Sequence, residues 1–138
     1  MLVSSMERAV PRKLESLAAL VDFVREFLGA ERMSGELAFD MDLVIEELFT
    51  NLVRHARGGG DIRVLLERGP GEVRIELRAA EASPFDPAAA PRVQVDLPLT
   101  ERRAGGLGIH FVRELCKRFH YEWRDGVGTT TVVMGVTE

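Results

Sequence analysis

The chain has 138 residues, of which 46% are apolar and 29% are charged; these proportions are ordinary for one globular domain and exclude a disordered chain. Its net charge of -4, with no block of lysine and arginine, argues against nucleic acid as the main partner. Cys116 is the only cysteine, which excludes an intrachain disulfide and a cysteine-based metal site.

The N-terminus shows no signal peptide, since no long apolar run follows a basic start. No stretch of the sequence approaches the roughly 20 apolar residues that a membrane-spanning helix needs. We therefore expect a cytoplasmic protein that does not contact a membrane.

The first half of the chain predicts one strand, two helices and a hairpin. Residues 9–11 read as a short edge strand, and the apolar spacing of three and four over 13–28 predicts an amphipathic helix. A second helix is predicted over 39–56, where three consecutive glycines end it. Alternating apolar and polar residues over 61–67 and 72–78 predict two strands joined by a turn.

The second half begins with an irregular segment, residues 84–107, which contains four prolines. A segment of this length inside a compact domain is typical of a lid or a binding loop. A helix over 109–119 and two strands over 120–124 and 129–136 complete the chain. Helices on one face of a mostly antiparallel sheet predict a single α+β domain, a two-layer sandwich over residues 1–138.

One row of polar side chains on the second predicted helix is a candidate site. Glu47, Asn51 and His55 follow one another at intervals of four, so they lie side by side at the border of the apolar face. The row is either a solvated helix border or the edge of a pocket. Asparagine is a poor residue for the interior of a helix, which favours the pocket slightly.

A cluster of glycines precedes the third predicted helix. Gly105, Gly106 and Gly108 surround Leu107 at the point where the unpaired N–H groups of a helix N-terminus favour an anion. Glycine also lets a phosphate approach the backbone closely. The cluster is therefore either a phosphate-binding turn or a flexible hinge.

Together, these motifs resemble the GHKL ATPase superfamily. The stretch "EELFTNLVRHA" is similar to its Glu-x-x-x-Asn box, and "FDPAAAP…DLPLTERRAGGLGIHFVREL" to its second glycine box with the upstream lid. The final "WRDGVGTTTVVM" resembles its last hairpin. Within the superfamily, the chain looks like the bacterial anti-sigma-factor serine/threonine kinases. The resemblance covers nearly the whole chain and implies a Bergerat-type ATP-binding fold, with three helices on one face of the sheet.

The resemblance also implies the roles of particular residues. Glu47 would be the general base, and Asn51 would hold Mg²⁺ together with ATP. The other residues expected to bind the nucleotide are His55, Phe85, Gly105, Gly106, Leu107, Gly108 and Thr131. The kinase would sequester a sigma factor and phosphorylate a STAS-type anti-sigma antagonist in a partner-switching pathway. A homodimer formed through the first helix and the edge strand is also implied, although core packing explains most of the leucines.

The sequence departs from the family where adenine should be recognised. Ala80 and Ala82 replace the Asp and Gly of the family's Asp-x-Gly motif. Glu81 is one residue late, and one step along a strand turns a side chain to the opposite face. Loss of one charge-assisted partner costs about 1.5–3 kcal/mol. A non-catalytic module that binds a sigma factor or an antagonist without phosphoryl transfer is therefore the alternative function.

Overall fold

The computed structural model describes residues 4–87 and 106–136. The elements follow in the order β1 (Ser4–Val10), η1 (Leu14–Ser16), α1 (Leu17–Ala30), α2 (Glu36–His55), β2 (Ile62–Gly69), β3 (Glu72–Ala80), α3 (Gly106–Leu115), β4 (Arg118–Arg124) and β5 (Val127–Gly135). Most of the expected lid, residues 84–107, lies outside the described residues, and so does Gly105. The described part of the lid is residues 84–87 and 106–107.

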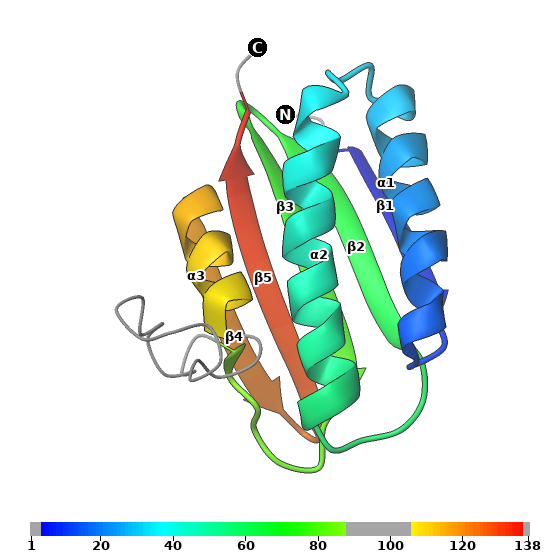
Figure 1. The fold of residues 1–138 in the computed structure, drawn as a ribbon, viewed down its shortest axis with the longest axis vertical. Helices are drawn as coiled ribbons and strands as arrows, with labels where there is room; N and C mark the ends of the chain where they lie inside the picture. Colours follow the sequence, from blue (N-terminus) through cyan, green and yellow to red (C-terminus); the bar gives the residue numbers. More distant parts are fainter. Residues whose placement is uncertain (1–3, 88–105, 137–138) are drawn as a thin grey trace.

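The strands form one five-stranded sheet in the order β1-β2-β3-β5-β4. Each described neighbour pair is antiparallel, and two hairpins, β2-β3 and β4-β5, supply four of the five strands. The three α-helices lie side by side over one face of this sheet, with α2 in the middle (Figure 1). The predicted α+β two-layer sandwich is confirmed, and the sheet is more regular than the mixed arrangement we expected.

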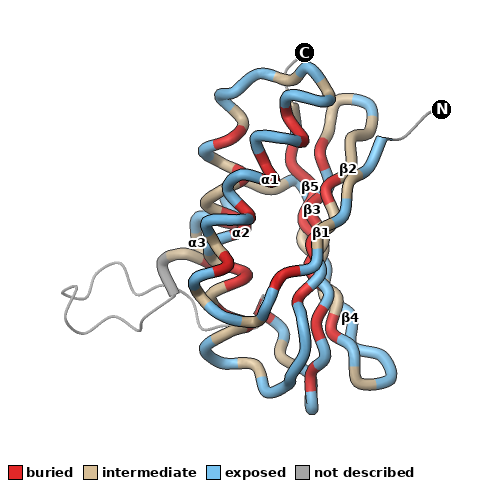
Figure 2. Tube along the Cα trace, turned by 90° about the vertical axis from the view of Figure 1, so that its right-hand side faces the viewer, coloured by how far each residue is buried: buried red, intermediate tan, exposed pale blue. Residues whose placement is uncertain are grey.

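Side-chain alternation separates the two faces of the sheet. In β3, Val73, Ile75, Leu77 and Ala79 are buried, while Arg74 and its even-numbered neighbours face outward. The buried residues concentrate between the helices and the sheet, as the edge-on view shows (Figure 2). The other face carries charged side chains, including a 2.9 Å ion pair from Arg63 to Glu7. The core therefore occupies a single layer, because only one face of the sheet is covered.

The helices contribute aromatic and branched side chains to this layer. The buried residues of α1 are Leu20, Phe23, Val24, Phe27 and Leu28. Val21 of the same helix is 39% exposed, so not every apolar residue of α1 joins the core. Within the part of the chain that the structure describes, no helix combines the length and apolar character needed to cross a bilayer.

Most element boundaries differ by a few residues from the sequence prediction, and β1 and α3 show this clearly. β1 has seven residues rather than three, and pairs with β2 along its whole length. α3 begins at Gly106, inside the glycine cluster, and ends at Leu115. The helix stops there because the chain turns into the sheet: the Lys117 N–H donates to the Val133 carbonyl over 2.7 Å.

Candidate functional site

The first part of the candidate site is the polar row on α2, formed by Glu47, Asn51 and His55. Asn51 Nδ2 donates a hydrogen bond of 3.2 Å to Glu47 Oε1, which joins two residues four positions apart. Asn51 is only 9% exposed, although it is polar, while Glu47 is partly buried and His55 is exposed. The row therefore runs from the edge of the core into solvent, which is the position of a pocket wall rather than of a fully solvated stripe.

The glycine cluster meets this row from α3. A Cβ added to Gly108 would lie 1.9 Å from Glu47 Oε2, so any side chain at this position would collide with the carboxylate. Gly108 lies in the first turn of α3, where backbone N–H groups have no partner within the helix. The structure thus brings two segments some 60 residues apart into contact, and it places a carboxylate beside a helix N-terminus.

Burial changes the acidity of Glu47. Loss of hydration raises the pKa of this carboxyl above its usual value of 4.5, and the hydrogen bond from Asn51 opposes that rise. A carboxylate with a raised pKa is a stronger proton acceptor than a solvated one. Burial therefore makes Glu47 a stronger proton acceptor than a carboxylate in solvent.

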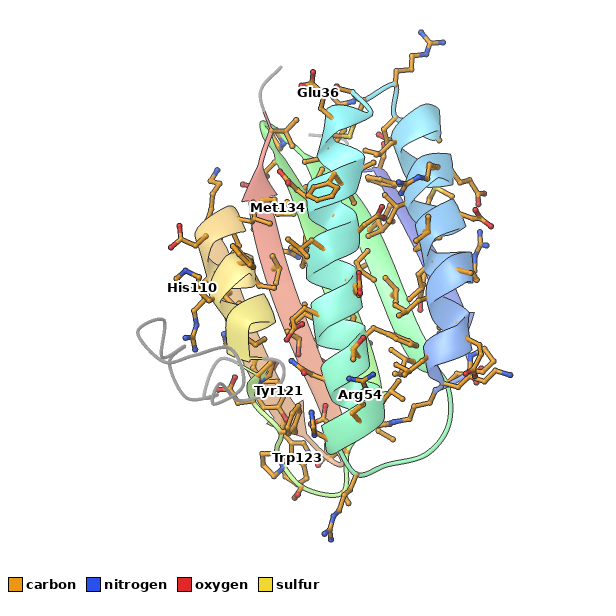
Figure 3. All side chains as sticks on the ribbon, in the orientation of Figure 1. Glu36, Arg54, His110, Tyr121, Trp123 and Met134 are labelled. Carbon is orange, nitrogen blue, oxygen red and sulfur yellow. The ribbon has the colours of Figure 1, made fainter. Side chains whose placement is uncertain are left out.

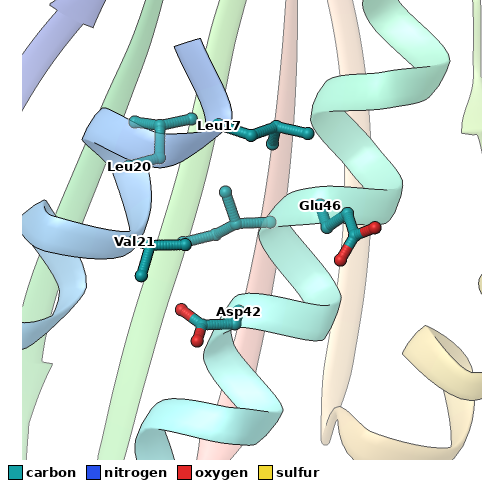
Figure 4. Close-up of a pocket in the computed structure, with 6 residues that line it drawn as sticks. Leu17, Leu20, Val21, Asp42 and Glu46 are labelled. Carbon is teal, nitrogen blue, oxygen red and sulfur yellow. The ribbon is translucent and has the colours of Figure 1, made fainter. Parts of the chain in front are cut away.

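A cavity of about 290 Å³ opens along this part of α2. Its lining residues are Leu14, Leu17, Glu46, Glu47, Thr50, Asn51, Arg54 and His55. A second hollow of about 50 Å³ lies between α1 and α2 and shares Leu17 and Glu46 with the first (Figure 4). We call these two adjoining hollows the groove. It is lined by apolar residues of η1 and α1 and by mostly polar residues of α2, and Glu47 lines the larger hollow.

The opposite end of the site is aromatic. The rings of His55 and Phe85 lie 6.3 Å apart, which joins the end of α2 to the segment after β3. The Phe85 N–H lies 2.8 Å from the Tyr121 hydroxyl oxygen. Tyr121 and Trp123 lie near the end of the molecule where α2 finishes, as does Arg54 (Figure 3).

Glu81 joins this aromatic group from the core side. Its side chain is only 2% exposed, and Oε1 accepts hydrogen bonds from the Tyr121 hydroxyl at 2.6 Å and from the Phe85 N–H at 3.1 Å. A Cβ on Gly128 would lie 1.9 Å from Oε2. Since odd-numbered residues of β3 face the core, Glu81 continues their pattern and the exposed Ala80 does not. This alternation was the signal in the sequence that could have identified Glu81.

A backbone clamp fixes the place where Glu81 turns inward. Arg12 Nη1 donates to the Ala80 carbonyl over 2.8 Å, and Nη2 lies 3.4 Å from the Ala56 carbonyl. The Ala82 N–H donates to the Arg57 carbonyl over 2.7 Å. The end of β3 is therefore held against the end of α2, and a guanidinium at a helix C-terminus also complements the helix dipole.

The remaining predicted residues fall into two groups. Gly106 and Leu107 belong to the first turn of α3, while Gly105 lies outside the described residues. Thr131 is paired with Glu76 and His120 on the open face of the sheet, away from the helices. Its neighbour Thr130, 3% exposed and paired with Leu77, faces the helices instead. A contact between Thr131 and the nucleotide stays a prediction.

Comparison with known proteins identifies the family to which this arrangement belongs. The family model described as "Histidine kinase-like ATPase domain" matches residues 10–135, and the chain belongs to this family. A curated relative, the serine/threonine-protein kinase BtrW of Bordetella bronchiseptica, is 28% identical over 99 residues, which are 70% of this chain and 69% of BtrW. The resemblance to the kinases of this superfamily is therefore confirmed.

Solved structures support the same fold. A chain from the SiaB-SiaC complex of Pseudomonas aeruginosa superposes with a TM-score of 0.58 at 18% identity, covering 95% of this chain and 89% of that one. The histidine kinase AdeS of Acinetobacter baumannii gives a TM-score of 0.53 at 11% identity, with coverages of 96% and 68%. At these identities the likeness concerns the fold alone.

The residues present fit the ATP that this family implies. Asn51 donates through Nδ2, so Oδ1 is the atom that could hold a hard cation. The described residues contain no group of three or more His, Cys, Asp or Glu placed to hold a metal. Mg²⁺ in nucleotide sites uses few protein ligands, since phosphate oxygens and waters complete its shell, so one asparagine is consistent with it.

Proposed function

We propose that this chain is an ATP-dependent protein kinase that phosphorylates a serine or threonine of a partner protein. The observation that carries the proposal is the Glu47 carboxylate, which is partly buried, held by Asn51, in contact with Gly108 and open to a cavity of about 290 Å³. A proton acceptor beside a helix N-terminus suits a reaction that joins a hydroxyl to a phosphate.

Each residue has a separate part in this reaction. Glu47 accepts the proton of the partner's hydroxyl. The hydroxyl oxygen bonds to the γ-phosphorus while the bond from that phosphorus to the β-γ bridging oxygen breaks, which releases ADP. Asn51 Oδ1 would hold Mg²⁺, whose charge would offset that of the phosphate oxygens. The N–H groups at the start of α3 bind phosphate oxygens, and the glycines there allow their close approach.

The groove between α1 and α2 supports a protein as the substrate. Leu14 and Leu17 offer an apolar contact beside Glu47, and the groove continues toward Val21 and Asp42. We propose that an anti-sigma antagonist presents its hydroxyl here and that the chain also sequesters a sigma factor in a partner-switching pathway. A homodimer through β1 and α1 belongs to the same proposal, and light scattering in solution would test it.

Phosphate transfer with matched variants tests the proposal. Purified protein is incubated with Mg²⁺, γ-labelled ATP and the candidate antagonist, and label on the antagonist is measured for the natural chain, Glu47→Gln and Glu46→Gln. Glu46 lines the same cavity but is exposed, so its variant controls for the loss of one negative charge. We expect transfer with the natural chain and Glu46→Gln only. Absence of transfer to every cognate antagonist would contradict a kinase.

Titration with Mg-ATP separates the kinase from the alternative, a module that binds a sigma factor or antagonist without nucleotide. The replacement of the Asp-x-Gly motif by Ala80 and Ala82 is the reason to test it. Micromolar binding of Mg-ATP by calorimetry would exclude the module. Binding of a protein partner without any binding of nucleotide would favour it.

A further inference from the structure

The outer face of α2 carries apolar side chains that the core does not use. Phe39 is 72% exposed, which makes it the most exposed large apolar side chain that the structure describes. Leu43 is partly exposed and lies four residues further along, on the same face of the helix. Single exposed apolar residues are common on protein surfaces, whereas a group of them marks an interaction site.

Phe111 of α3 extends this group across the seam between the two helices. α2 and α3 lie side by side and run in opposite directions (Figure 1). Gly108 lies against Glu47, and Phe111 and Leu43 each lie one turn beyond that contact, on the facing sides of the helices. Phe111 is 44% exposed, so the seam is open to solvent there. We call Phe39, Leu43 and Phe111 the apolar strip.

Acidic residues border the apolar strip. Residues 36–47 of α2 include no basic side chain and five acidic ones, which are Glu36, Asp40, Asp42, Glu46 and Glu47. Asp42 pairs with Arg25 over 2.8 Å, whereas Glu36, Asp40 and Glu46 form no ion pair with another residue that the structure describes. At 100° per residue, Glu36 and Asp40 lie on the α3 side of the strip and Glu46 on the α1 side. The strip is therefore apolar along its middle and negative along both margins.

The chemistry of this surface determines what can cover it. The backbone groups along a helix are paired within it, so an extended segment cannot add here as it does at a sheet edge. Side chains must make the contacts, and an amphipathic helix laid along a seam offers apolar anchors at the required spacing. A second copy bound through the same face would oppose carboxylates with carboxylates, which is unfavourable.

We propose that the apolar strip binds an amphipathic helix of a partner protein, one whose apolar side is flanked by lysine or arginine. Phe39 and Leu43 are separated by about 6 Å along α2, so two turns of such a helix cover them and reach Phe111. The basic flanks of the helix then face Glu36 and Asp40 on one margin and Glu46 on the other. The inference goes beyond the proposed function, because this binding requires neither nucleotide nor phosphate transfer.

Model peptides test the charge preference without nucleotide. Two helical peptides carry the same leucines at spacings of three and four, and the remaining positions are lysine and arginine in one and glutamate in the other. Each is labelled with a fluorophore and titrated with the full chain, and anisotropy measures binding. We expect the basic peptide to bind at least about tenfold more tightly than the acidic one, with the difference falling as salt is added. Equal affinities for the two peptides would overturn the proposal.

Replacing the exposed phenylalanines tests the position of the site. Phe39→Ala and Phe111→Ala should each weaken binding of the basic peptide by about tenfold or more, the usual loss for an aromatic anchor. Val127→Ala is the control, since Val127 is 37% exposed but lies on the open face of the sheet, and it should leave the affinity unchanged. An unchanged affinity in both phenylalanine variants would show that the peptide binds elsewhere and would overturn the proposal.

Neutralising the acidic margin tests the source of the charge preference. Glu36→Gln and Asp40→Asn should each lower the affinity for the basic peptide severalfold and reduce its dependence on salt. Glu122→Gln removes an acidic residue of β4 that pairs with Arg124, and it should change neither property. The same loss in all three variants would mean that the net charge of the chain, rather than this margin, attracts the peptide.

Two further measurements keep the outcome decisive. Circular dichroism verifies that each variant is folded, and if Phe39→Ala is not folded, then Phe111→Ala and Asp40→Asn decide the question. Sedimentation of the natural chain and of Phe39→Ala, without peptide, tests the rival occupant. We expect no change in oligomeric state, and a dimer that Phe39→Ala dissociates would assign the strip to a second copy instead. None of these measurements depends on phosphate transfer, so this inference and the kinase proposal can fail separately.

Discussion

The two ends of the candidate site each place a carboxylate against a glycine, but they treat that carboxylate differently. Glu47 meets Gly108 and Glu81 meets Gly128, and in both pairs an added Cβ would lie 1.9 Å from Oε2. Glu47 borders an open cavity and has one hydrogen-bond donor, Asn51. Glu81 is buried and has two donors on one oxygen and none on the other.

This difference separates an accessible carboxylate from one that is held in place. A carboxylate that takes up a proton during a reaction needs access to the reacting hydroxyl and freedom to change charge. A carboxylate that is buried and accepts two hydrogen bonds is fixed in position instead. The five predictions that follow test whether the two ends can be altered independently, beginning with the largest expected effect.

Replacing Glu47 should have the largest effect on phosphate transfer. Glu47→Gln keeps the size of the side chain and its contact with Gly108 but removes the proton acceptor. A general base contributes about 10²–10⁴-fold, so the transfer rate should fall by roughly that factor. Transfer is measured as the initial rate of antagonist labelling. Equal rates for Glu47→Gln and the control Glu46→Gln would contradict a catalytic role for Glu47.

Adding a methyl group at each glycine should damage one end at a time. Gly108→Ala displaces the Glu47 carboxylate and should reduce phosphate transfer, whereas Gly128→Ala displaces Glu81 and should lower the raised pKa of Tyr121, which is hydrogen-bonded to Glu81. Each overpacked site should also lower the free energy of unfolding by about 1–3 kcal/mol. Chemical denaturation measures stability, and Gly59→Ala is the control because nothing lies within 4 Å of a Cβ there. Loss of both properties in both variants would show that the ends are not independent.

How far each end could be predicted depends on the kind of pattern that marks it. The Glu47 end is encoded in local spacing, because Glu47 and Asn51 are one helical turn apart and the three glycines of the cluster fall within four residues. These short patterns identified the family and the fold. The Glu81 end depends on where a strand finishes, and a one-residue offset exchanges buried and exposed positions. Matching by motif therefore aligned the family's Asp with Ala80 and selected Thr131, while the residues on the helix side of the sheet are Glu81 and Thr130.

Removing the Arg12 clamp should affect the Glu81 end of the site more than the Glu47 end. Arg12→Ala leaves the Ala80 and Ala56 carbonyls without their charged donor. The expected loss in the free energy of unfolding is about 1–2 kcal/mol, within the range for a hydrogen bond to a charged group. Arg63→Ala removes an exposed ion pair and should cost less than about 1 kcal/mol. Denaturant titration of both variants compares them, and equal losses would show that Arg12 fixes nothing.

The raised pKa of Glu47 predicts a small gain in stability for the variant that loses activity. Burial disfavours the ionised carboxylate, so the folded natural chain binds more protons than the unfolded chain between pH 4.5 and the raised pKa. Its stability therefore falls as pH rises through that window, while neutral Gln has no such loss. Glu47→Gln should melt at a higher temperature than the natural chain at pH 7, and the difference should vanish below pH 4.5. A constant difference at all pH values would exclude this cause.

The smallest expected effect concerns the ionisation of Tyr121. Because Tyr121 is the only tyrosine in the chain, its titration can be followed by itself. Burial, and then the hydrogen bond to Glu81, raises the pKa of Tyr121 from 10.0 to about 12. The folded protein therefore keeps this proton where the unfolded chain loses it, and stability should decline between pH 10 and 12. Ultraviolet absorption of the phenolate follows the titration directly. Glu81→Gln should lower the midpoint, since it removes the negative charge that opposes ionisation, whereas Glu47→Gln should not move it. A midpoint that responds equally to both variants would mean that the two ends of the site share one electrostatic environment.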